Sequence, residues 1–176
     1  MKKIIIIGAG AMGSAFAVPC LDNKNDVTVV GTHLEDNLIE TINSNNHIHP
    51  LLKTQLPKEI KFKRFENLQT ILNQNIDILV CGVSSVGIEW FVQQISKNYK
   101  DKLPIVLLTK GLSIVDNELT TLSDKIKNLL KKEGRSEINI SAIKGPCLAA
   151  GLANKMRTGT VIANQNIKKS KILKDI

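Results

Sequence analysis

Short apolar segments alternate with segments of helical periodicity along almost all of the 176 residues. The apolar segments are rich in β-branched residues and bounded by turn-forming residues, which is typical of strands buried on both faces. On this basis seven strands are predicted, at Lys3–Ile7, Val27–Gly31, Ile60–Arg64, Asp77–Cys81, Ile105–Leu108, Ile138–Ile143 and Thr160–Ala163. Six helices are predicted between them, at Ala11–Leu21, Asp36–Asn43, Glu66–Asn73, Ile88–Lys97, Asn117–Lys132 and Cys147–Asn154.

This alternation predicts an α/β fold with a doubly wound, mainly parallel sheet of the Rossmann type. Right-handed crossovers predict the strand order 3-2-1-4-5-6, with a ligand crevice above the first strand. Pro19 is expected to bend or end the first helix, because proline lacks an N–H donor and crowds the preceding turn. The segment Leu51–Pro57 is expected to be an irregular connection.

The first strand leads directly into three glycines, Gly8, Gly10 and Gly13, at the spacing G-x-G-x-x-G. In a strand–turn–helix context, the first glycine permits a tight turn and the second lets the backbone approach a pyrophosphate. The third lets the helix pack closely on the strand. The amino end of the helix, with Ala11 and Met12, directs unpaired N–H groups and a positive dipole at that pyrophosphate. The motif therefore predicts a dinucleotide site.

The charge of the chain changes this picture little. The net charge is +8, but the cations are mostly lysines, with arginine only at Arg64, Arg135 and Arg157, and aromatic residues make up 3%. Base readout and base stacking rely on arginine and aromatic side chains. We therefore expect no nucleic-acid partner and a weakly basic surface that attracts phosphorylated small molecules.

Candidate metal ligands and disulfides are few. Cys20, Cys81 and Cys147 are an odd number at wide spacing, which argues against a disulfide framework and a zinc site and fits a reducing cytoplasm. His47 and His49 are expected to be solvated loop residues rather than metal ligands. No apolar run approaches the roughly 18 residues of a membrane span.

Two further signals follow later strands. Lys110 comes directly after the strand Ile105–Leu108, where side chains face the crevice and an ammonium can bind a substrate oxygen. Gly145 and Pro146 form a turn before a predicted helix, whose amino end favours anions. Taken singly, the first is equally well an exposed lysine and the second a plain turn with proline near a helix start.

Taken together, these signals resemble those of the NAD(P)-dependent glycerol-3-phosphate dehydrogenases. The resemblance rests on Gly8-Ala-Gly10-Ala-Met-Gly13, then Thr109-Lys110-Gly111-Leu112, then Gly145-Pro146-x-x-Ala149, in this order. Further similar segments are Val30-Gly31-Thr32, His49–Pro57 and the Val80–Val86 loop. The resemblance covers essentially the whole chain.

The resemblance implies hydride transfer between NAD(P)H and dihydroxyacetone phosphate or sn-glycerol 3-phosphate, the precursor of glycerophospholipids. It implies that Lys110 contacts the reacting end of this phosphorylated triose and lies beside the cofactor, and that Gly145 contacts the substrate. Cys147 stands at a substrate-binding position where many relatives carry Ser or Thr. A thiol is a weaker donor than a hydroxyl, which argues against the same hydrogen bond to the substrate here. Separately, we expect Cys147 to pack rather than to have a redox role. The implied cofactor-binding residues are Gly8, Gly10, Ala11, Met12, Gly13, Thr32, His33, Ser84, Lys110 and Ala149.

The domain prediction follows from the end of the chain. Residues 1–164 are expected to form the dinucleotide-binding domain, and residues 165–176 the start of a truncated linker or helix, because no capping signal closes that basic stretch. The resemblance implies that the general acid/base lysine, its neighbouring Asn and a phosphate-binding Arg-Asn pair lie in a C-terminal helical domain absent here. We therefore expect cofactor binding with negligible turnover, and a homo-oligomer only in the full-length form.

Either NAD or NADP fits this reading, and we expect NADPH to be favoured. Dinucleotide sites that select NAD place a carboxylate at the tip of the second strand. The tip here is Gly31-Thr32-His33, with Glu35 and Asp36 slightly later, so rejection of a 2′-phosphate is not expected. Thr32 and His33 are instead available to bind a phosphate.

Other functions stay open at this stage. Ketopantoate and pyrroline-carboxylate reductases share the glycine run but lack the Thr-Lys-Gly and Gly-Pro-x-x-Ala pairing. An NAD(P)-binding regulatory module would use the same fold without catalysis. A methyltransferase with a glycine-rich first turn would bind S-adenosylmethionine.

Overall fold

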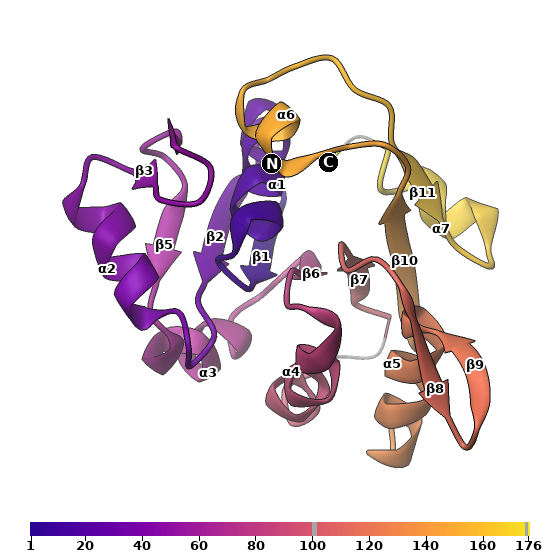
Figure 1. Ribbon diagram of the computed structural model, residues 1–176. Coiled ribbons are helices and arrows are strands. Elements are labelled where there is room, and N and C mark those ends of the chain that lie inside the picture. The colour runs from indigo at the N-terminus through magenta and orange to yellow at the C-terminus, as the bar shows by residue number, and fades with distance from the viewer. Residues whose placement is uncertain (100–101, 175) are drawn as a thin grey trace.

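The structure, a computed structural model, describes residues 1–99, 102–174 and 176 (Figure 1). A seven-stranded sheet crosses the centre of the described chain in the order β11-β10-β7-β6-β1-β2-β5. Its strands are β1 (Lys3–Ile7), β2 (Asp26–Val30), β5 (Lys61–Lys63), β6 (Ile78–Cys81), β7 (Pro104–Leu107), β10 (Asn139–Lys144) and β11 (Val161–Ala163). All seven predicted strands are confirmed to within two residues at each end.

The strand order confirms the predicted doubly wound topology. Strand β1 pairs in parallel with β2 on one side, with Ile4 opposite Val27, and with β6 on the other, with Ile4 opposite Ile78. The remaining pairs are also parallel except β10 with β11, which is antiparallel with Ala142 opposite Ala163. The sheet is therefore mainly parallel, and the carboxyl ends of its parallel strands meet at one edge.

Helices cover both faces of the sheet (Figure 1). They are α1 (Ala11–Asp22), α2 (Asp36–Ser44), α3 (Leu68–Leu72), α4 (Ile88–Ile95), α5 (Leu122–Lys132), α6 (Ala149–Ala153) and α7 (Ile167–Lys171). Helices α1, α2 and α6 supply residues to one buried cluster and α3, α4 and α5 to the other. In β1, Ile4 and Ile6 enter the first cluster while Ile5 and Ile7 enter the second. This double burial explains why the strand is apolar at every position.

The predicted helix Asn117–Lys132 is wrong over its first five residues. A hairpin of β8 (Leu112–Val115) and β9 (Glu118–Thr121) occupies this region, and α5 begins only at Leu122. The turn residues Asp116 and Asn117 both have positive φ, the conformation that a two-residue hairpin turn requires. The side chain of Thr121 then accepts a hydrogen bond from the Asp124 amide and caps α5.

A second hairpin lies in the predicted irregular connection. It consists of β3 (Ile48–His49) and β4 (Thr54–Gln55). Helix α1 runs through Pro19 to Asp22, so Pro19 does not end it. The amide of Asn23 closes the last turn on the Pro19 carbonyl, which keeps the helix continuous beyond the proline.

Two predicted helices have different starts. The segment from Glu66 opens as a 3-10 turn at Phe65–Asn67 before α3, and α6 begins at Ala149 rather than at Cys147. Leu148 has an extended backbone with φ −103° and ψ 147°, so the Gly-Pro turn is separated from α6 by an extended residue.

The end of the chain packs against the domain. Leu173 is buried in the cluster that includes α1, and the Asn23 side-chain amide donates to the Ile176 carbonyl at 3.0 Å. Asp175, which belongs to the predicted linker, lies outside the described residues. No helix in the described part of the chain has the length and apolar character needed to cross a bilayer.

Candidate functional site

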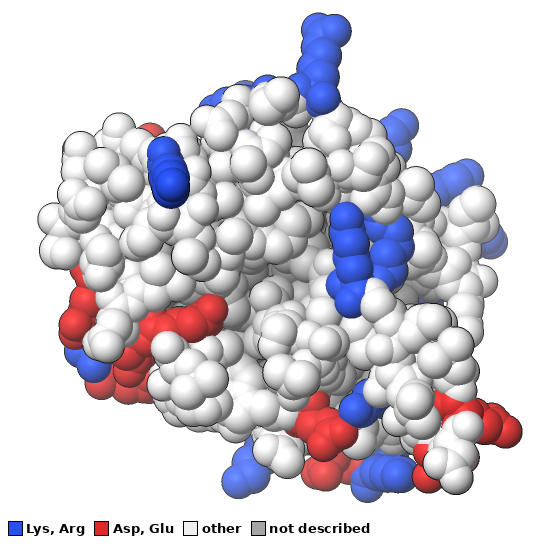
Figure 2. Space-filling view, in the orientation of Figure 1, with Lys and Arg blue, Asp and Glu red and all other residues white. Residues whose placement is uncertain are grey.

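A cleft of about 740 Å³ opens at the carboxyl edge of the sheet. Figure 2 shows it as the hollow near the centre of the molecule. Its walls come from five segments far apart in the sequence. The lining residues are Gly10, Ala11, Met12, Thr32, His33, Leu34, Glu35, Gly82, Val83, Ser84, Val86, Gly87, Trp90, Leu108, Thr109, Lys110, Cys147, Leu148 and Ala149.

The glycine turn after β1 forms the floor of the cleft. Gly8 has φ +109°, and a Cβ there would lie 2.7 Å from the carbonyl carbon of Gly82. A Cβ at Gly13 would overlap the carbonyl oxygen of Gly8 and lie 3.5 Å from Ile6 Cγ2. The tight turn at Gly8 and the close helix packing at Gly13 are confirmed. Gly8 and Gly13 thus shape the turn from below, whereas Gly10 lies at the surface of the cleft.

Helix α1 directs its amino end into the cleft. Gly10 is its N-cap residue and provides no side-chain hydrogen bond, and its first turn carries no acidic residue. The first amides of a helix have no intrahelical acceptor, and the helix dipole is positive at this end. Ala11 and Met12 line the cleft here, so their N–H groups are placed to bind an anion.

The glycine turn is held from behind by a buried histidine. The carbonyl of Ala9 accepts hydrogen bonds from Ser14 Oγ at 2.8 Å and from His49 Nε2 at 2.9 Å. His49 Nδ1 accepts from the amides of Leu51 and Leu52 at 3.2 and 3.4 Å, so the ring proton lies on Nε2. The prediction that His49 is solvated is wrong, because the β3–β4 hairpin folds it onto the glycine turn.

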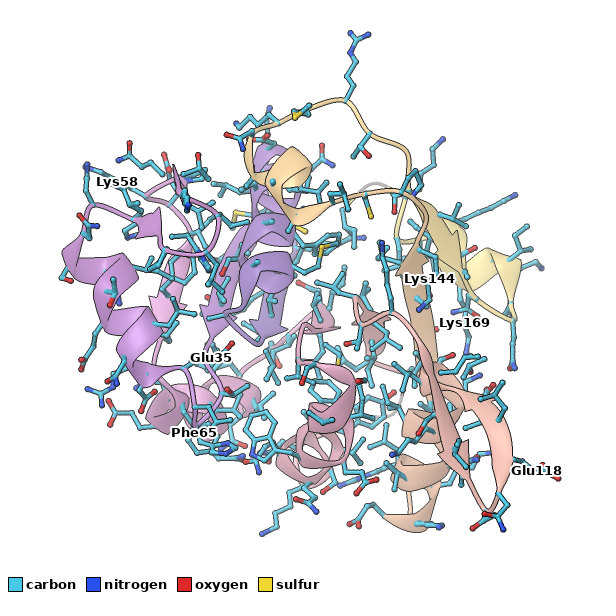
Figure 3. All side chains as sticks on the ribbon, viewed as in Figure 1. Glu35, Lys58, Phe65, Glu118, Lys144 and Lys169 are labelled. Atoms are coloured by element: carbon cyan, nitrogen blue, oxygen red, sulfur yellow. The ribbon has the colours of Figure 1, made fainter. Side chains whose placement is uncertain are left out.

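Glu35 also contacts this turn. Its Oε2 accepts from the amide of Ala9 at 3.0 Å and from the amide of Thr32 at 2.8 Å. Figure 3 shows Glu35 beside the cleft, at the end of the loop after β2. The sequence places this carboxylate too late to reach the tip of β2. The Glu35 amide, however, donates to the Thr32 carbonyl at 2.9 Å, and this tight turn brings the side chain back to the tip.

An aromatic cluster stands at the same end of the cleft. The ring centroid of His33 lies 5.3 Å from that of Trp90 and 6.0 Å from that of Phe65, and those of Phe65 and Trp90 are 5.7 Å apart. His33 and Trp90 line the cleft. The rings are tilted or edge-on to one another rather than stacked, and an aromatic surface of this kind suits a flat heteroaromatic ring. Sequence reasoning missed Trp90, although a single tryptophan just after the Ser84 loop is a usable signal.

Lys110 lines the opposite end of the cleft, and Lys144 lies close to it. Lys110 Nζ donates to the carbonyls of Gly145 at 2.9 Å and Cys147 at 3.4 Å. Lys144, at the end of β10, donates from its Nζ to the carbonyl of Thr109, which follows β7, at 3.1 Å. Burial and the neighbouring Lys110 ammonium lower the pKa of Lys144. The two lysines thus tie the end of β7 to the turn after β10, and Figure 2 shows lysines on this side of the hollow.

The two substrate-binding candidates after β10 differ in their exposure. Gly145 has φ +96° and offers its carbonyl to Lys110. Cys147 is buried, and its Sγ lies 3.6 Å from Thr160 Oγ1. The packing expected for Cys147 is therefore confirmed. The three cysteines are free and buried, and burial raises the pKa of Cys20 and Cys81 to about 12.

The cleft brings most of the predicted site residues together. Those that line it are Gly10, Ala11, Met12, Thr32, His33, Ser84, Lys110, Cys147 and Ala149. Gly8 and Gly13 lie beneath the turn, and Gly145 contacts the cleft through Lys110. Within residues 1–99, 102–174 and 176, no group of three or more His, Cys, Asp or Glu side chains is arranged to hold a metal ion.

The doubly wound sheet, the glycine turn and the helix amino end define the Rossmann class of dinucleotide-binding domains. Comparisons with known proteins refine this class. The family model of the NAD-dependent glycerol-3-phosphate dehydrogenase N-terminus matches residues 3–170, and the chain belongs to this family.

Curated relatives support this membership. The chain is 32% identical to the NADP(+)-dependent glycerol-3-phosphate dehydrogenase of Archaeoglobus fulgidus, over 98% of this chain and 50% of the relative. It is 34% identical to the glycerol-3-phosphate dehydrogenase [NAD(P)+] of Mesoplasma florum, over 98% of this chain and 49% of the relative. The chain therefore spans about half the length of the curated relatives it matches.

Solved structures show the same fold. The glycerol-3-phosphate dehydrogenase of Coxiella burnetii aligns over 98% of this chain and 49% of its own, with a TM-score of 0.74 at 20% identity. DsGPDH of Dunaliella salina aligns over 99% of this chain and 31% of its own, with a TM-score of 0.79 at 18% identity.

Proposed function

We propose that this chain binds NAD or NADP and forms the cofactor half of a dehydrogenase that interconverts dihydroxyacetone phosphate and sn-glycerol 3-phosphate. The observation that carries the proposal is the amino end of α1, which presents the amides of Ala11 and Met12 to the cleft above the glycine turn. Family membership favours this substrate over that of the ketopantoate-type reductases and over a module without catalysis.

In the proposed complex the cofactor would lie along the cleft in one direction. The amides of Ala11 and Met12 would bind the diphosphate, and the aromatic surface of His33 and Trp90 would hold the adenine. Thr32 lies on the side where the adenosine ribose would bind, while Ser84 lies in the loop after β6 that borders the cleft. Lys110 and Ala149 border the far end, where the nicotinamide would lie.

Lys110 is the proposed substrate contact. The bound nicotinamide would supply the hydride. The Lys110 ammonium is positioned by the carbonyls of Gly145 and Cys147, and it would stabilise negative charge that develops on the substrate oxygen. Gly145 and Cys147 border the same region and are the remaining proposed substrate contacts.

The rest of the reaction requires groups outside this chain. We propose residues 1–164 as the cofactor domain and 165–176 as the connection to a second domain that holds the phosphate and the general acid/base lysine. Proton transfer by a positioned group contributes on the order of 10²–10⁴ in rate. The chain alone should therefore bind cofactor without measurable turnover. A homo-oligomer is proposed only for the full-length protein. The three buried free thiols support a cytoplasmic location.

Fluorescence titration with NADH and NADPH tests the proposal. Trp90 is the single tryptophan and lines the cleft, so its emission should fall as the reduced cofactor binds. The informative variant is Ala11→Asp. A carboxylate in the first turn of α1 interacts favourably with the positive end of the helix dipole but repels a diphosphate. We expect at least a tenfold loss of affinity with undiminished stability.

A matched control is Lys58→Ala, which changes an exposed residue outside the cleft and should leave affinity unchanged. Binding that is equally tight in Ala11→Asp would place the cofactor elsewhere. Failure of the unmodified chain to bind either cofactor would refute the proposed function.

A further inference from the structure

We propose that Glu35 makes this site selective for a cofactor with a free ribose 2′-hydroxyl, so that the chain binds NADH more tightly than NADPH. The inference rests on the proposed function and identifies the residue that sets its cofactor. It reverses the preference that the sequence alone predicts.

The carboxylate of Glu35 is fixed in place by two backbone donors. Its Oε2 bridges the amide of Ala9 in the glycine turn and the amide of Thr32 after β2. Its Oε1 faces Gly10, because a Cβ built there would lie 3.7 Å from that oxygen. Glu35 thus lies between the diphosphate position and the tip of β2, where the adenosine ribose must pass.

A carboxylate in this position accepts hydrogen bonds from ribose hydroxyls and repels a phosphate. Glu35 also takes a donor that a 2′-phosphate would need, since the Thr32 amide already binds Oε2. The imidazole of His33 packs against Trp90 and Phe65. The Thr32 amide is therefore already bonded to Glu35, and the His33 ring lies against the two aromatic side chains where the adenine would bind.

The charged residues around Glu35 also disfavour binding of a 2′-phosphate. Asp36 and Glu40 follow Glu35 on α2, and Arg64 bonds to Glu40 at 2.7 Å and approaches Asp36 at 3.6 Å. The arginine nearest to this end of the cleft thus binds carboxylates, whereas a site for NADP needs a free guanidinium to clamp the 2′-phosphate. Lys110 is the lysine among the lining residues, and it lies at the nicotinamide end.

Figure 2 shows this separation of charge directly. Acidic side chains gather on the left of the hollow and lysines on its right. Figure 3 places Glu35 on the left side, near Phe65, and Lys144 on the right. The adenosine end of the site is therefore acidic in spite of the net charge of +8.

Dissociation constants for NADH and NADPH, measured by Trp90 quenching, test the inference. We expect the chain to bind NADH at least tenfold more tightly. Glu35→Gln keeps an acceptor for the amides of Ala9 and Thr32 but removes the charge, so it should tighten NADPH binding and bring the two constants within about threefold. The control Glu59→Gln makes the same charge change at an exposed position outside the cleft and should leave the ratio unchanged.

The outcomes distinguish failure of the proposed function from failure of the role assigned to Glu35. If neither cofactor binds, the proposed function fails. If NADPH binds more tightly than NADH, or equally well, the cofactor site stands and the role of Glu35 is refuted. If Glu35→Gln weakens both cofactors by the same factor, Glu35 only supports the glycine turn, and the inference is again refuted. A preference for NADH that falls as ionic strength rises would support repulsion as its cause.

Discussion

At the level of single residues, the space available for a side chain restricts which residues the glycine turn accepts. A Cβ at Gly8 would clash with the backbone of Gly82 and one at Gly13 with the Gly8 carbonyl, whereas a Cβ at Gly10 would make only an ordinary contact with Glu35 Oε1 at 3.7 Å. Glu35 and His49 then bond to the two polar groups of Ala9, its amide and its carbonyl. The turn is thus held by side chains that are distant in sequence.

Gly13→Ala should be destabilising for this reason. The added methyl group overlaps the Gly8 carbonyl oxygen and forces α1 away from β1. Overpacking of this kind typically costs about 1–3 kcal/mol. Urea unfolding followed by circular dichroism measures the change. Gly10→Ala is the matched control, since the nearest atom to its Cβ is 3.7 Å away. Equal stabilities of the two variants would contradict the packing described.

The buried thiols should give stability a pH dependence. Burial raises the pKa of Cys20 and Cys81 to about 12, while a cysteine in the unfolded chain has a pKa of about 8.5. Between these values the unfolded chain has lost protons that the folded chain retains. The thiols' contribution to the free energy of unfolding is therefore fully present below about pH 8.5 and is lost as the pH rises towards 12.

Thiol labelling measures how far folding protects Cys20 and Cys81 from reaction. At pH 8 the native chain should react slowly with a thiol reagent at Cys20 and Cys81, and the urea-unfolded chain should react at once. Mass spectrometry of peptides assigns the sites. Native labelling of either cysteine at the unfolded rate would show that it is accessible as a thiolate.

At the level of elements, the β3–β4 hairpin supports a site that it does not line. It carries His49 to the back of the glycine turn, and the turn after β2 carries Glu35 to the other side. The β8–β9 hairpin shows how local backbone conformation can override a helical pattern, since Asp116 and Asn117 form its turn with positive φ. The β3–β4 hairpin and the turn after β2 therefore position the glycine turn beneath the cleft.

His49→Ala should loosen this support. The change leaves the amides of Leu51 and Leu52 without their ring acceptor and removes one donor to the Ala9 carbonyl. Loss of a buried partner costs about 1–3 kcal/mol. We expect lower stability in urea and weaker binding of NADH. Lys58→Ala, an exposed change shortly after the same hairpin, should alter neither quantity. Unchanged affinity in His49→Ala would show that the hairpin does not position the turn.

At the level of the whole molecule, two buried clusters cover the sheet, and the carboxyl ends of its parallel strands form one edge. The cleft at this edge is acidic where the adenosine would bind and basic where the substrate would bind. A ligand that binds only the folded state stabilises it by mass action. Saturation of the cleft should therefore be visible in the stability of the entire chain.

Thermal unfolding with cofactor tests this coupling. At a concentration of about 100 Kd the stabilisation is about 2.7 kcal/mol. For a chain of this length that corresponds to a rise in Tm of roughly 5–11 °C. Scanning fluorimetry with NADH measures the shift, and a tenfold loss of affinity in Ala11→Asp should reduce it to about half at the same NADH concentration. An unchanged Tm for the unmodified chain at saturating NADH would contradict binding to the folded state.

The predictable part of this protein is the part encoded by neighbouring residues. The segment from β1 through Gly13 contains its strand, turn and helix start in one run, so its fold and proposed use follow from spacing. Lys110 was predictable for a similar reason, because a residue that directly follows a strand lies at the edge of the sheet. The β8–β9 hairpin was not, because its second strand lies inside the segment from Asn117 onwards whose pattern predicts a helix.

The sequence by itself determined the sheet order, the glycine turn and the family, because hydrophobic periodicity and motif spacing are local properties that survive without coordinates. Only the tertiary structure decided that Glu35 reaches the tip of β2, that His49 is buried and that Trp90 meets His33. Each of these depends on how a turn or hairpin folds back across the sheet. Contacts of this kind are set by packing between distant segments, which spacing along the chain does not encode.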